Sequence, residues 1–441
     1  MREKGKRILS YIGIFVITLM ILWLLLIGAA MISNNQIKQN MQESALSYGQ
    51  AEAFAFCDGR KLNGVADNYA DSIWLNVAWY MGKGNPIEAS LNTKYYDGEE
   101  MGENAGLYFA VNDDTIEANV VYTRYWHGTA GIIRILHMFT DVSGIKIMGL
   151  CFALFLATVL IMLLLREKRI ALAAGVVLSF CAIEFWKMGL SMEYQPSFIL
   201  CFIMSILYLV VEKRGNGPLM DLSVICGAMT AFFDFLTTET MVILVPLILV
   251  VTIRSMDGRL EDLKKSVKWL TCCILAWVTA YVGTFLVKWT IATIVTGENH
   301  FLTAMASVGE RISGSVDEAI PGGAIGQSMY AVASNLSVLF GAEQRIDAAV
   351  VIAGTLLLAG VVVSVWYLFP KKKRDMTATA LLLTLGSMVF VRYLILGNQS
   401  YLHSFFTYRA FVSVILAMCG ILAVNCELPK RKKMHRNGKK K

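Results

Sequence analysis

Two carboxylates stand four residues apart in the stretch DNYADSIWLNVAWYM, residues 67–81. In a helix, Asp67 and Asp71 lie on one face, and the apolar residues of the stretch give that helix a buried side. A carboxylate in such a place can take a proton from a substrate hydroxyl. The same positions suit helix capping, because Asp67 can be the N-cap and Asp71 falls in the first turn, where the helix dipole favours an acid. Both interpretations remain open for Asp67, and chemistry is favoured for Asp71.

Other ionisable residues lie inside apolar stretches, where a charge costs roughly 2.5–3.5 kcal/mol at mid-bilayer. Glu184, Asp234 and Arg392 belong to three predicted helices that run in one direction, and each lies roughly 20–23 Å from the start of its helix. Snorkelling to the interface is an alternative for the basic residues. Acids and bases that recur at one depth in the membrane favour a shared cavity. Further ionisable residues lie toward the external ends of the predicted helices, namely Glu193, Glu239, Lys288, His403 and Arg409.

A third group occurs in RYWHGTAGIIRILHMF, residues 124–139, whose apolar residues recur at helical spacing. This pattern predicts an amphipathic helix in the membrane interface. Arg124, His127 and Arg134 are then expected at headgroup depth, where Arg is suited to hold a lipid-linked phosphate through paired donors. Binding of ordinary lipid headgroups is the alternative.

The composition shows which kind of scaffold must position these residues. The 441 residues are 56% apolar and 17% charged, with a mean hydropathy of +0.56. Soluble domains are about 45–50% apolar and about 25% charged, so the excess is expected to face lipid. The net charge of +7 comes mostly from runs beside apolar stretches and indicates membrane topology rather than nucleic-acid binding. The nine cysteines show neither a disulfide framework nor metal-ligand spacing.

The apolar stretches predict an all-α membrane protein with about ten transmembrane helices. The first, Ile8 to about Ile32, is too long for the core of a signal peptide and is expected to remain as an anchor. A polar segment of about 110 residues follows it, which is too long for a simple connector. The other nine predicted spans are 145–165, 170–187, 196–211, 220–238, 240–253, 269–295, 347–369, 377–397 and 404–426.

Basic runs between the spans fall on one side if the spans alternate, and the positive-inside rule makes that side the cytoplasm. Both termini are therefore predicted to be cytoplasmic, in a multi-pass protein of the plasma membrane. The segment 326–341 is interpreted as a re-entrant or interfacial helix. Counting it as a span would place the basic run at 371–374 on the external side of the membrane. The predicted order is a cytoplasmic tail with the first span (1–32), a large external loop with the interfacial helix (33–144), spans two to seven (145–296), a second external loop (297–346), spans eight to ten (347–426) and a basic cytoplasmic tail (427–441).

This arrangement resembles the GT-C superfamily of polytopic glycosyltransferases, which use lipid-phosphate-linked sugars on the external side of the membrane. The resemblance covers most of the chain as architecture, and five patches are similar to an uncharacterised bacterial set of membrane proteins. In that set the last patch tends to begin Asn-His-Ser, whereas Gln399 stands here in place of the histidine, which leaves no catalytic histidine at this position. The patches are DNYADSIWLN (67–76), RYWHG (124–128), SMEYQPSF (191–198), FFDFLTTET (232–240) and NQSYLHSFFTYR (398–409).

The resemblance implies transfer of a sugar from a polyprenyl-phosphate donor to a glycan, lipid or protein of the cell envelope. Asp71 or Asp67 is then the general base on the acceptor hydroxyl. A lipid monophosphate leaving group requires no metal, although some members of the superfamily use one, and Asp67, Asp71 and Asp234 could supply oxygen ligands. The implied partners are the lipid donor, the acceptor and membrane lipid, without nucleic acid. The implied phosphate-binding residues are Arg124, His127, Arg392, His403 and Arg409, and the implied cavity residues are Glu184, Glu193, Asp234, Glu239 and Lys288.

Two other classes of function fit the same composition. A transporter or flippase for an envelope precursor is the main alternative, although such proteins usually carry internal repeats and charged groups near the midplane. The chain shows no repeat, and its ionisable residues crowd one side. A non-catalytic scaffold whose first loop binds a partner is the second alternative. Nucleotide-binding, zinc-protease and serine-hydrolase motifs do not occur in the sequence.

Overall fold

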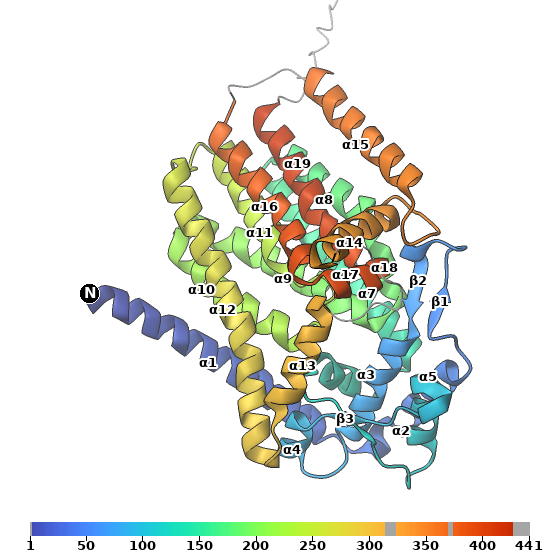
Figure 1. Cartoon of the computed structure of the whole chain (residues 1–441). Coiled ribbons are helices and arrows are strands. Elements are labelled where there is room, and N and C mark those ends of the chain that lie inside the picture. Colours follow the sequence, from blue (N-terminus) through green and yellow to red (C-terminus); the bar gives the residue numbers. More distant parts are fainter. Residues whose placement is uncertain (1, 314–322, 369–373, 427–441) are drawn as a thin grey trace, which may run out of the picture.

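The structure is a computed structural model that describes residues 2–313, 323–368 and 374–426. The described chain is almost entirely helical, with two short antiparallel strand pairs as its sheet structure (Figure 1). The predicted all-α class is confirmed. The helices that fall on the ten predicted spans are α1 (Arg2–Ala30), α7 (Val142–Arg166), α8 (Ile170–Ala182), α9 (Gln195–Val211), α10 (Asn216–Phe233), α11 (Met241–Met256), α12 (Leu263–Thr296), α15 (Ala348–Leu368), α16 (Met376–Ile395) and α19 (Val412–Asn425).

Seven helical segments of the described chain are long and apolar enough to cross a membrane, which indicates a multi-pass membrane protein. They contain α1, α7, α9, α12, α15, α16 and α19. The apolar helices α8 and α11 are shorter, and α10 lies on the fifth predicted span. Ten crossings therefore stay a prediction, although each predicted span coincides with a helix.

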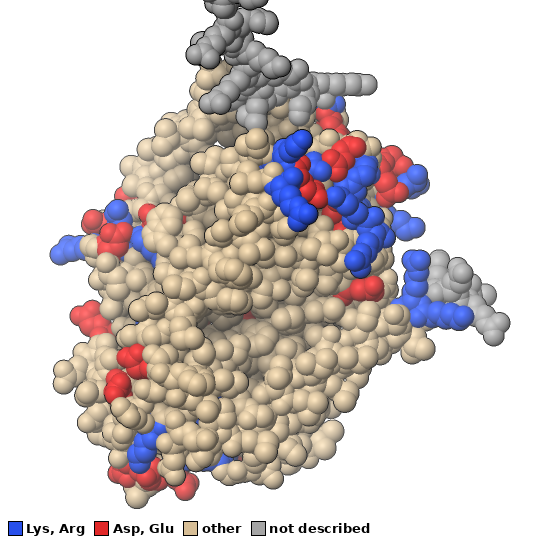
Figure 2. Space-filling model, turned by 180° about the vertical axis from the view of Figure 1, so that it is seen from behind, with Lys and Arg blue, Asp and Glu red and all other residues tan. Residues whose placement is uncertain are grey.

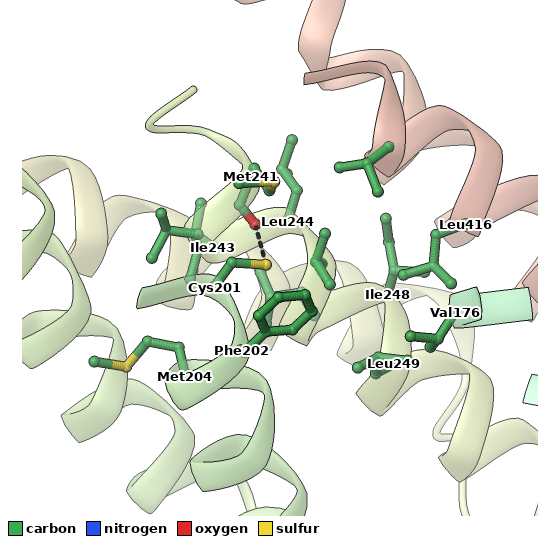
Figure 3. Close-up of a cluster of buried hydrophobic side chains, with 14 of the residues drawn as sticks. Val176, Cys201, Phe202, Met204, Met241, Ile243, Leu244, Ile248, Leu249 and Leu416 are labelled. Carbon is green, nitrogen blue, oxygen red and sulfur yellow. Dashed lines mark hydrogen bonds between the residues drawn. The ribbon is translucent and has the colours of Figure 1, made fainter. Parts of the chain in front are cut away.

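Helix α11 lies at the centre of the helical bundle. Its residues from Met241 to Arg254 are buried, and α9, α10, α16 and α19 pack around it. Figure 3 shows this core, where Ile248 and Leu249 of α11 lie near Val176 of α8 and Leu416 of α19. A helix that is apolar on every face is stable only when other helices or lipid cover it. The short α11 is therefore the helix that the rest of the bundle encloses.

The segment between α1 and α7 folds into a compact extramembrane unit at one end of the bundle (Figure 1). A capping box of Ser33 and Gln36 begins its first helix, so the chain turns sharply as it leaves α1. The unit has its own apolar core, which includes Trp74, Trp79 and Trp126. Its elements are α2 (Asn34–Gly49), β1 (Phe54–Phe56), η1 (Leu62–Gly64), β2 (Val65–Asp67), α3 (Asn68–Tyr80), α4 (Pro86–Leu91), β3 (Lys94–Tyr95), η2 (Glu99–Met101), α5 (Gly102–Asn112), β4 (Val120–Val121) and α6 (Gly128–Leu136).

The predicted amphipathic helix at 124–139 corresponds to α6, which is shorter than expected. Its Ile132 and Ile135 are exposed, whereas Arg134 is fully buried. Arg134 donates to the backbone carbonyls of Ala29, Ala78 and Ile32. Arg134 does not offer its donors to a lipid phosphate, because the carbonyls hold its guanidinium inside the protein and join α6 to α1 and α3.

Several short helices cover the bundle beside the extramembrane unit. The stretch predicted as a re-entrant or interfacial helix is helical and packs against α16, α17 and α18. Another helix, α13, packs against α12 and α17 (Figure 1). These elements are η3 (Phe185–Leu190), η4 (Met192–Tyr194), α13 (His300–Ser313), α14 (Gly323–Leu339), α17 (Gly397–Leu402), α18 (Ser404–Thr407) and η6 (Tyr408–Phe411). The short helix η5 (Glu212–Arg214) instead follows α9 directly, in the connection that leads to α10.

Charged side chains border an uncharged belt on the face seen in Figure 2, and many gather at its upper edge. Ion pairs join the connections that follow α7, α9 and α11, which were predicted to share one side. Their distances are 2.6 Å for Arg169–Asp257, 2.7 Å for Lys213–Glu167 and 2.8 Å for Arg259–Glu212. These three connections therefore meet at one end of the bundle.

We expect Ile248→Ala to destabilise the protein, because Ile248 is fully buried in the core of Figure 3. A cavity of this kind lowers the free energy of unfolding by about 2–5 kcal/mol. The control is Ile352→Ala in α15, whose side chain is 61% exposed. Thermal unfolding in detergent measures both variants, and an equal loss in the two would contradict the central position of α11.

Candidate active site

A polar pocket of about 310 Å³ lies where the extramembrane unit meets the helical bundle. Its carboxylates are Asp67, at the start of α3, and Glu193, in η4. Two guanidiniums also line it, Arg124 from the segment after β4 and Arg311 from α13. The remaining wall is largely aromatic, with side chains from α3, β3 and the turn after α10, and with His403 and Gln399 from the chain after α16. The pocket therefore contains both signs of charge and aromatic faces.

An apolar groove of about 550 Å³ adjoins this pocket. Apolar side chains of α11, α12, α13 and α16 line it, among them Trp277, Phe285 and Met388. Arg124, Tyr125 and Arg311 line both cavities, so the groove meets the polar pocket at two guanidiniums. An elongated apolar ligand with an anionic end fits such a pair of cavities.

Asp67 is the N-cap of α3, as the capping interpretation expected, and it also faces the polar pocket. Its Oδ1 accepts a hydrogen bond of 2.8 Å from the Ala70 amide, and its own amide donates to Ser191 Oγ at 2.7 Å. Burial raises the pKa of Asp67 above its usual range; the Ala70 amide opposes the shift and the charge of Asp71 adds to it. Capping and chemistry are thus compatible at this position.

Asp71 is fully buried and lines neither the polar pocket nor the apolar groove. Its Oδ1 accepts from the amides of Met192 and Glu193 at 2.8 and 3.3 Å. Its Oδ2 accepts from the Tyr48 hydroxyl at 2.9 Å and lies 3.0 Å from Lys146 Nζ. Both oxygens are therefore occupied by protein donors. The sequence favours Asp71 as the catalytic base. Its contacts instead give it a structural role, because they connect α2, α3, α7 and η4.

The guanidiniums of Arg124 and Arg311, at the junction of the two cavities, make few hydrogen bonds, all of them to neutral groups. Arg124 donates to Ser307 Oγ at 3.1 Å and to the Tyr122 hydroxyl at 3.3 Å, and it lies 4.5 Å from the centre of the Tyr122 ring. Arg311 donates to Gln399 Oε1 at 3.4 Å and lies 5.5 Å from the Tyr125 ring centre. Within the described chain, neither guanidinium forms an ion pair with a carboxylate, so both can accept an anion.

Arg311 and its helix α13 were not predicted as part of a site. The signal was present in the sequence, because Phe301, Leu302, Met305, Val308 and Ile312 recur at helical spacing beside Arg311. The same kind of pattern drew attention to Arg124. The sequence predicts a loop for this stretch, because only the more apolar segment that follows it, 326–341, is predicted to be a helix.

Arg392 and Glu239 form a buried ion pair on the wall of the apolar groove. Arg392 Nε donates to Glu239 Oε1 at 2.8 Å, and Nη1 donates to Ser400 Oγ at 2.9 Å. Its Nη2 donates to the carbonyls of Leu236 and Thr237. Every guanidinium nitrogen is engaged, so Arg392 secures the turn after α10 against α16 rather than offering free donors to a phosphate.

His403 lines the polar pocket, whereas His127 does not. Burial lowers the pKa of each imidazole to about 3, so both are neutral at physiological pH. His403 stacks on Phe406, and His127 makes a hydrogen bond of 2.7 Å between Nε2 and the Tyr122 carbonyl. A neutral ring provides one hydrogen bond but no charge, so neither histidine offers a cation to a phosphate group.

Besides Asp71 and His127, four residues predicted in the site lie outside both cavities. Glu184 pairs with Lys187 at 2.6 Å, and Lys288 donates to the Ser90 and Leu91 carbonyls. Asp234 accepts from Ser197 Oγ at 2.7 Å and from Thr237. Arg409 is buried with its guanidinium 4.3 Å from the Tyr194 ring centre. The shared depth of these residues reflects structural contacts in the same part of the bundle.

The acids considered as metal ligands do not converge on one point. Asp71 and Asp234 direct their oxygens to protein donors, whereas Asp67 faces the pocket. No group of three or more His, Cys, Asp or Glu side chains within the described residues could hold a metal ion. The residues present therefore do not fit the metal site that Asp67, Asp71 and Asp234 were considered to form.

No protein-family model, curated protein or solved structure matches this chain. The chemistry of the two cavities is consequently the basis for any assignment of function.

We expect Asp71→Asn to destabilise the protein, because an amide cannot replace a carboxylate that accepts from four donors. Loss of one partner of a buried ion pair costs about 3–5 kcal/mol. Thermal unfolding in detergent measures the effect. Asp114→Asn is the control, since its ion pair with Lys38 is exposed and such pairs contribute about 0–1 kcal/mol. Equal stability of the two variants would contradict the structural role of Asp71.

Proposed function

We propose that the protein is a membrane glycosyltransferase of the GT-C type. It moves a sugar from a polyprenyl-phosphate donor to a hydroxyl of a cell-envelope acceptor on the extracytoplasmic side. The observation that carries this proposal is the junction of the two cavities, where Arg124 and Arg311 separate an apolar groove from a pocket with a buried carboxylate. A lipid-linked sugar has the same order of parts: an apolar tail, a phosphate and a polar sugar.

The donor lies with its lipid in the groove between α11, α12, α13 and α16. Its phosphate lies between the two guanidiniums, which present planar sets of donors that match phosphate oxygens. The sugar then extends into the polar pocket, where Trp74, Tyr122 and Tyr125 offer flat apolar faces. Gln399, which accepts a hydrogen bond from Arg311, lies beside the phosphate position and can bind a sugar hydroxyl.

Asp67 is the general base in this proposal. Its carboxylate takes the proton of the acceptor hydroxyl as that oxygen bonds to the anomeric carbon of the sugar. The bond between the anomeric carbon and the phosphate oxygen breaks, and its electron pair stays on the phosphate. Arg124 and Arg311 stabilise the charge that develops there, because fixed cations in a site shielded from water act strongly on a leaving group. The lipid phosphate then leaves through the groove.

The sidedness of this reaction rests on the basic residues of the chain. The three connections that meet through ion pairs after α7, α9 and α11 are the cytoplasmic loops of the positive-inside assignment. The extramembrane unit is then external, in a multi-pass protein of the plasma membrane with both termini cytoplasmic. The polar pocket thus lies where lipid-linked sugars and envelope acceptors meet.

We expect Asp67→Asn to abolish sugar transfer while donor binding persists, because the amide cannot accept the proton but can still cap α3 through its oxygen. Purified protein in nanodiscs with a lipid-linked sugar extract measures turnover, and a fluorescent polyprenyl phosphate measures binding. Asp114→Asn, which lies outside both donor cavities, should retain transfer. Full turnover by the Asp67 variant would refute the proposal, and movement of donor across sealed vesicles without turnover would favour a transporter.

Arg311→Met is expected to weaken donor binding by roughly 10- to 100-fold, since a hydrogen bond to a charged group contributes about 1.5–3 kcal/mol. Arg124→Met should act in the same direction. The matched control is Arg345→Met, whose guanidinium also stacks on a tyrosine, 4.9 Å from the Tyr401 ring centre, but lines neither cavity. Binding of fluorescent polyprenyl phosphate and of polyprenol, which lacks the phosphate, separates loss of the charge contact from loss of the groove. Equal donor affinity in the Arg311 and Arg345 variants would contradict the phosphate site.

A further inference from the structure

Two carboxyl groups face each other in the polar pocket. Asp67 comes from the start of α3 and Glu193 from η4; both line the cavity of about 310 Å³, and each side chain acts on the other through a hydrogen bond. Asp67 is 2% exposed and Glu193 is 6% exposed. Two carboxylates in contact repel one another strongly when they are buried, so such a pair holds a proton between them.

The charged side chains around Asp67 and Glu193 do not replace the proton that the pair shares. Lys146 of α7, whose charge acts on Asp67, pairs with Asp71 rather than with either member of the pair. Asp71 and Asp234 add further acidic groups nearby, each with its own hydrogen-bond donors. The titratable and charged groups that face the pair from neighbouring elements are Tyr48, Tyr69, Asp71, Tyr95, Tyr122, Arg124, Tyr125, Lys146, Tyr194, Asp234, Arg311 and His403.

The hydrogen bonds show which member carries the charge. Asp67 Oδ1 accepts from the Ala70 amide at the N-terminus of α3, where the helix dipole also favours a negative group. The backbone amide of Glu193 donates to Asp71, not to a carboxyl of the pair. The charge is therefore better placed on Asp67 and the proton on Glu193.

We propose that Glu193 is a positioning residue for the transfer reaction: its protonated carboxyl donates a hydrogen bond to Asp67 and directs the base toward the acceptor hydroxyl. This inference rests on the proposed function of Asp67. Before transfer the pair carries one proton and one negative charge. Asp67 gains the acceptor proton as the new glycosidic bond forms, and the neutral pair returns that proton to water after the product leaves. Glu193 keeps its own proton throughout.

The test compares Glu193→Gln with Glu193→Met in the full-length protein in nanodiscs. The glutamine amide can still donate to Asp67, so turnover should stay within about threefold of wild type at neutral pH. Methionine fills similar space without a donor, and turnover should fall roughly 10- to 100-fold with donor affinity unchanged. Glu52→Gln, an exposed carboxyl in the same extramembrane unit, is the matched control. An inactive glutamine variant, or a methionine variant as active as wild type, would overturn the role.

The pH profile supplies a readout that a merely structural side chain would not move. Burial raises the pKa of Asp67 above its usual range, so transfer should rise with pH as Asp67 loses its proton, in wild type and in Glu193→Gln alike. At alkaline pH the wild-type pair loses its second proton and with it the hydrogen bond that directs the base. Activity should decline there in wild type, and Glu193→Gln should remain active to higher pH. An unchanged alkaline limb in this variant would contradict the proposal.

Infrared spectroscopy tests the proton without any substrate. At a pH above the raised pKa of Asp67, wild-type protein should show the carbonyl band of a protonated carboxylic acid, which Glu193→Gln removes and Glu52→Gln preserves. If that band survives in Glu193→Gln, the assignment of the proton is wrong even though Asp67 is still the base. If Asp67→Asn retains full turnover, the proposed function itself fails. The two failures are therefore distinguishable.

Discussion

A carboxylate buried among apolar side chains must be supplied with donors, and this requirement at Asp71 determines how the extramembrane unit meets the bundle. Asp71 collects the Tyr48 hydroxyl of α2, the Lys146 ammonium of α7 and the amides that begin η4. One side chain thereby positions α3 beside η4. Asp67 and Glu193 belong to the two segments that Asp71 joins, so their contact in the pocket depends on it. The residue that does no chemistry in the proposal is the one that aligns the residues that do.

The other buried charges divide according to their partners. Arg134, Lys288 and Arg392 direct donors to backbone carbonyls, and Arg392 also pairs with Glu239, so they hold elements together. Arg124 and Arg311 rest instead on tyrosine rings and make few hydrogen bonds. Arg345 and Arg409 also lie on tyrosine rings, but neither lines a cavity. Few competing partners together with a position on a cavity wall, rather than depth in the membrane, distinguish the charges available to a ligand.

The sequence was sufficient to predict the helical class, each apolar stretch and the helix that carries Asp67 and Asp71, because these depend on local composition and spacing. It could not show which of the two acids faces a cavity, since both lie on one face of α3 and two of the four donors to Asp71 come from residues more than a hundred positions later. The depth argument for Glu184, Asp234 and Lys288 failed to place them in the cavities, because helix position says nothing of the direction in which a side chain turns. Arg311 is absent from the predicted site because the sequence predicts a loop, not a helix, for the segment that forms α13.

The junction at Tyr125 also connects two distant parts of the chain. Arg124 belongs to the first extramembrane segment and Arg311 to the helix that follows α12, and both guanidiniums lie near the Tyr125 ring. Without an anion, two cations at one aromatic face repel each other, and the repulsion falls only when negative charge lies between them. A phosphate between them therefore relieves this repulsion, while an uncharged lipid does not. In the proposed reaction the donor phosphate completes the wall of the pocket that holds the sugar, so that recognition of the leaving group and orientation of the reacting carbon arise from the same contacts.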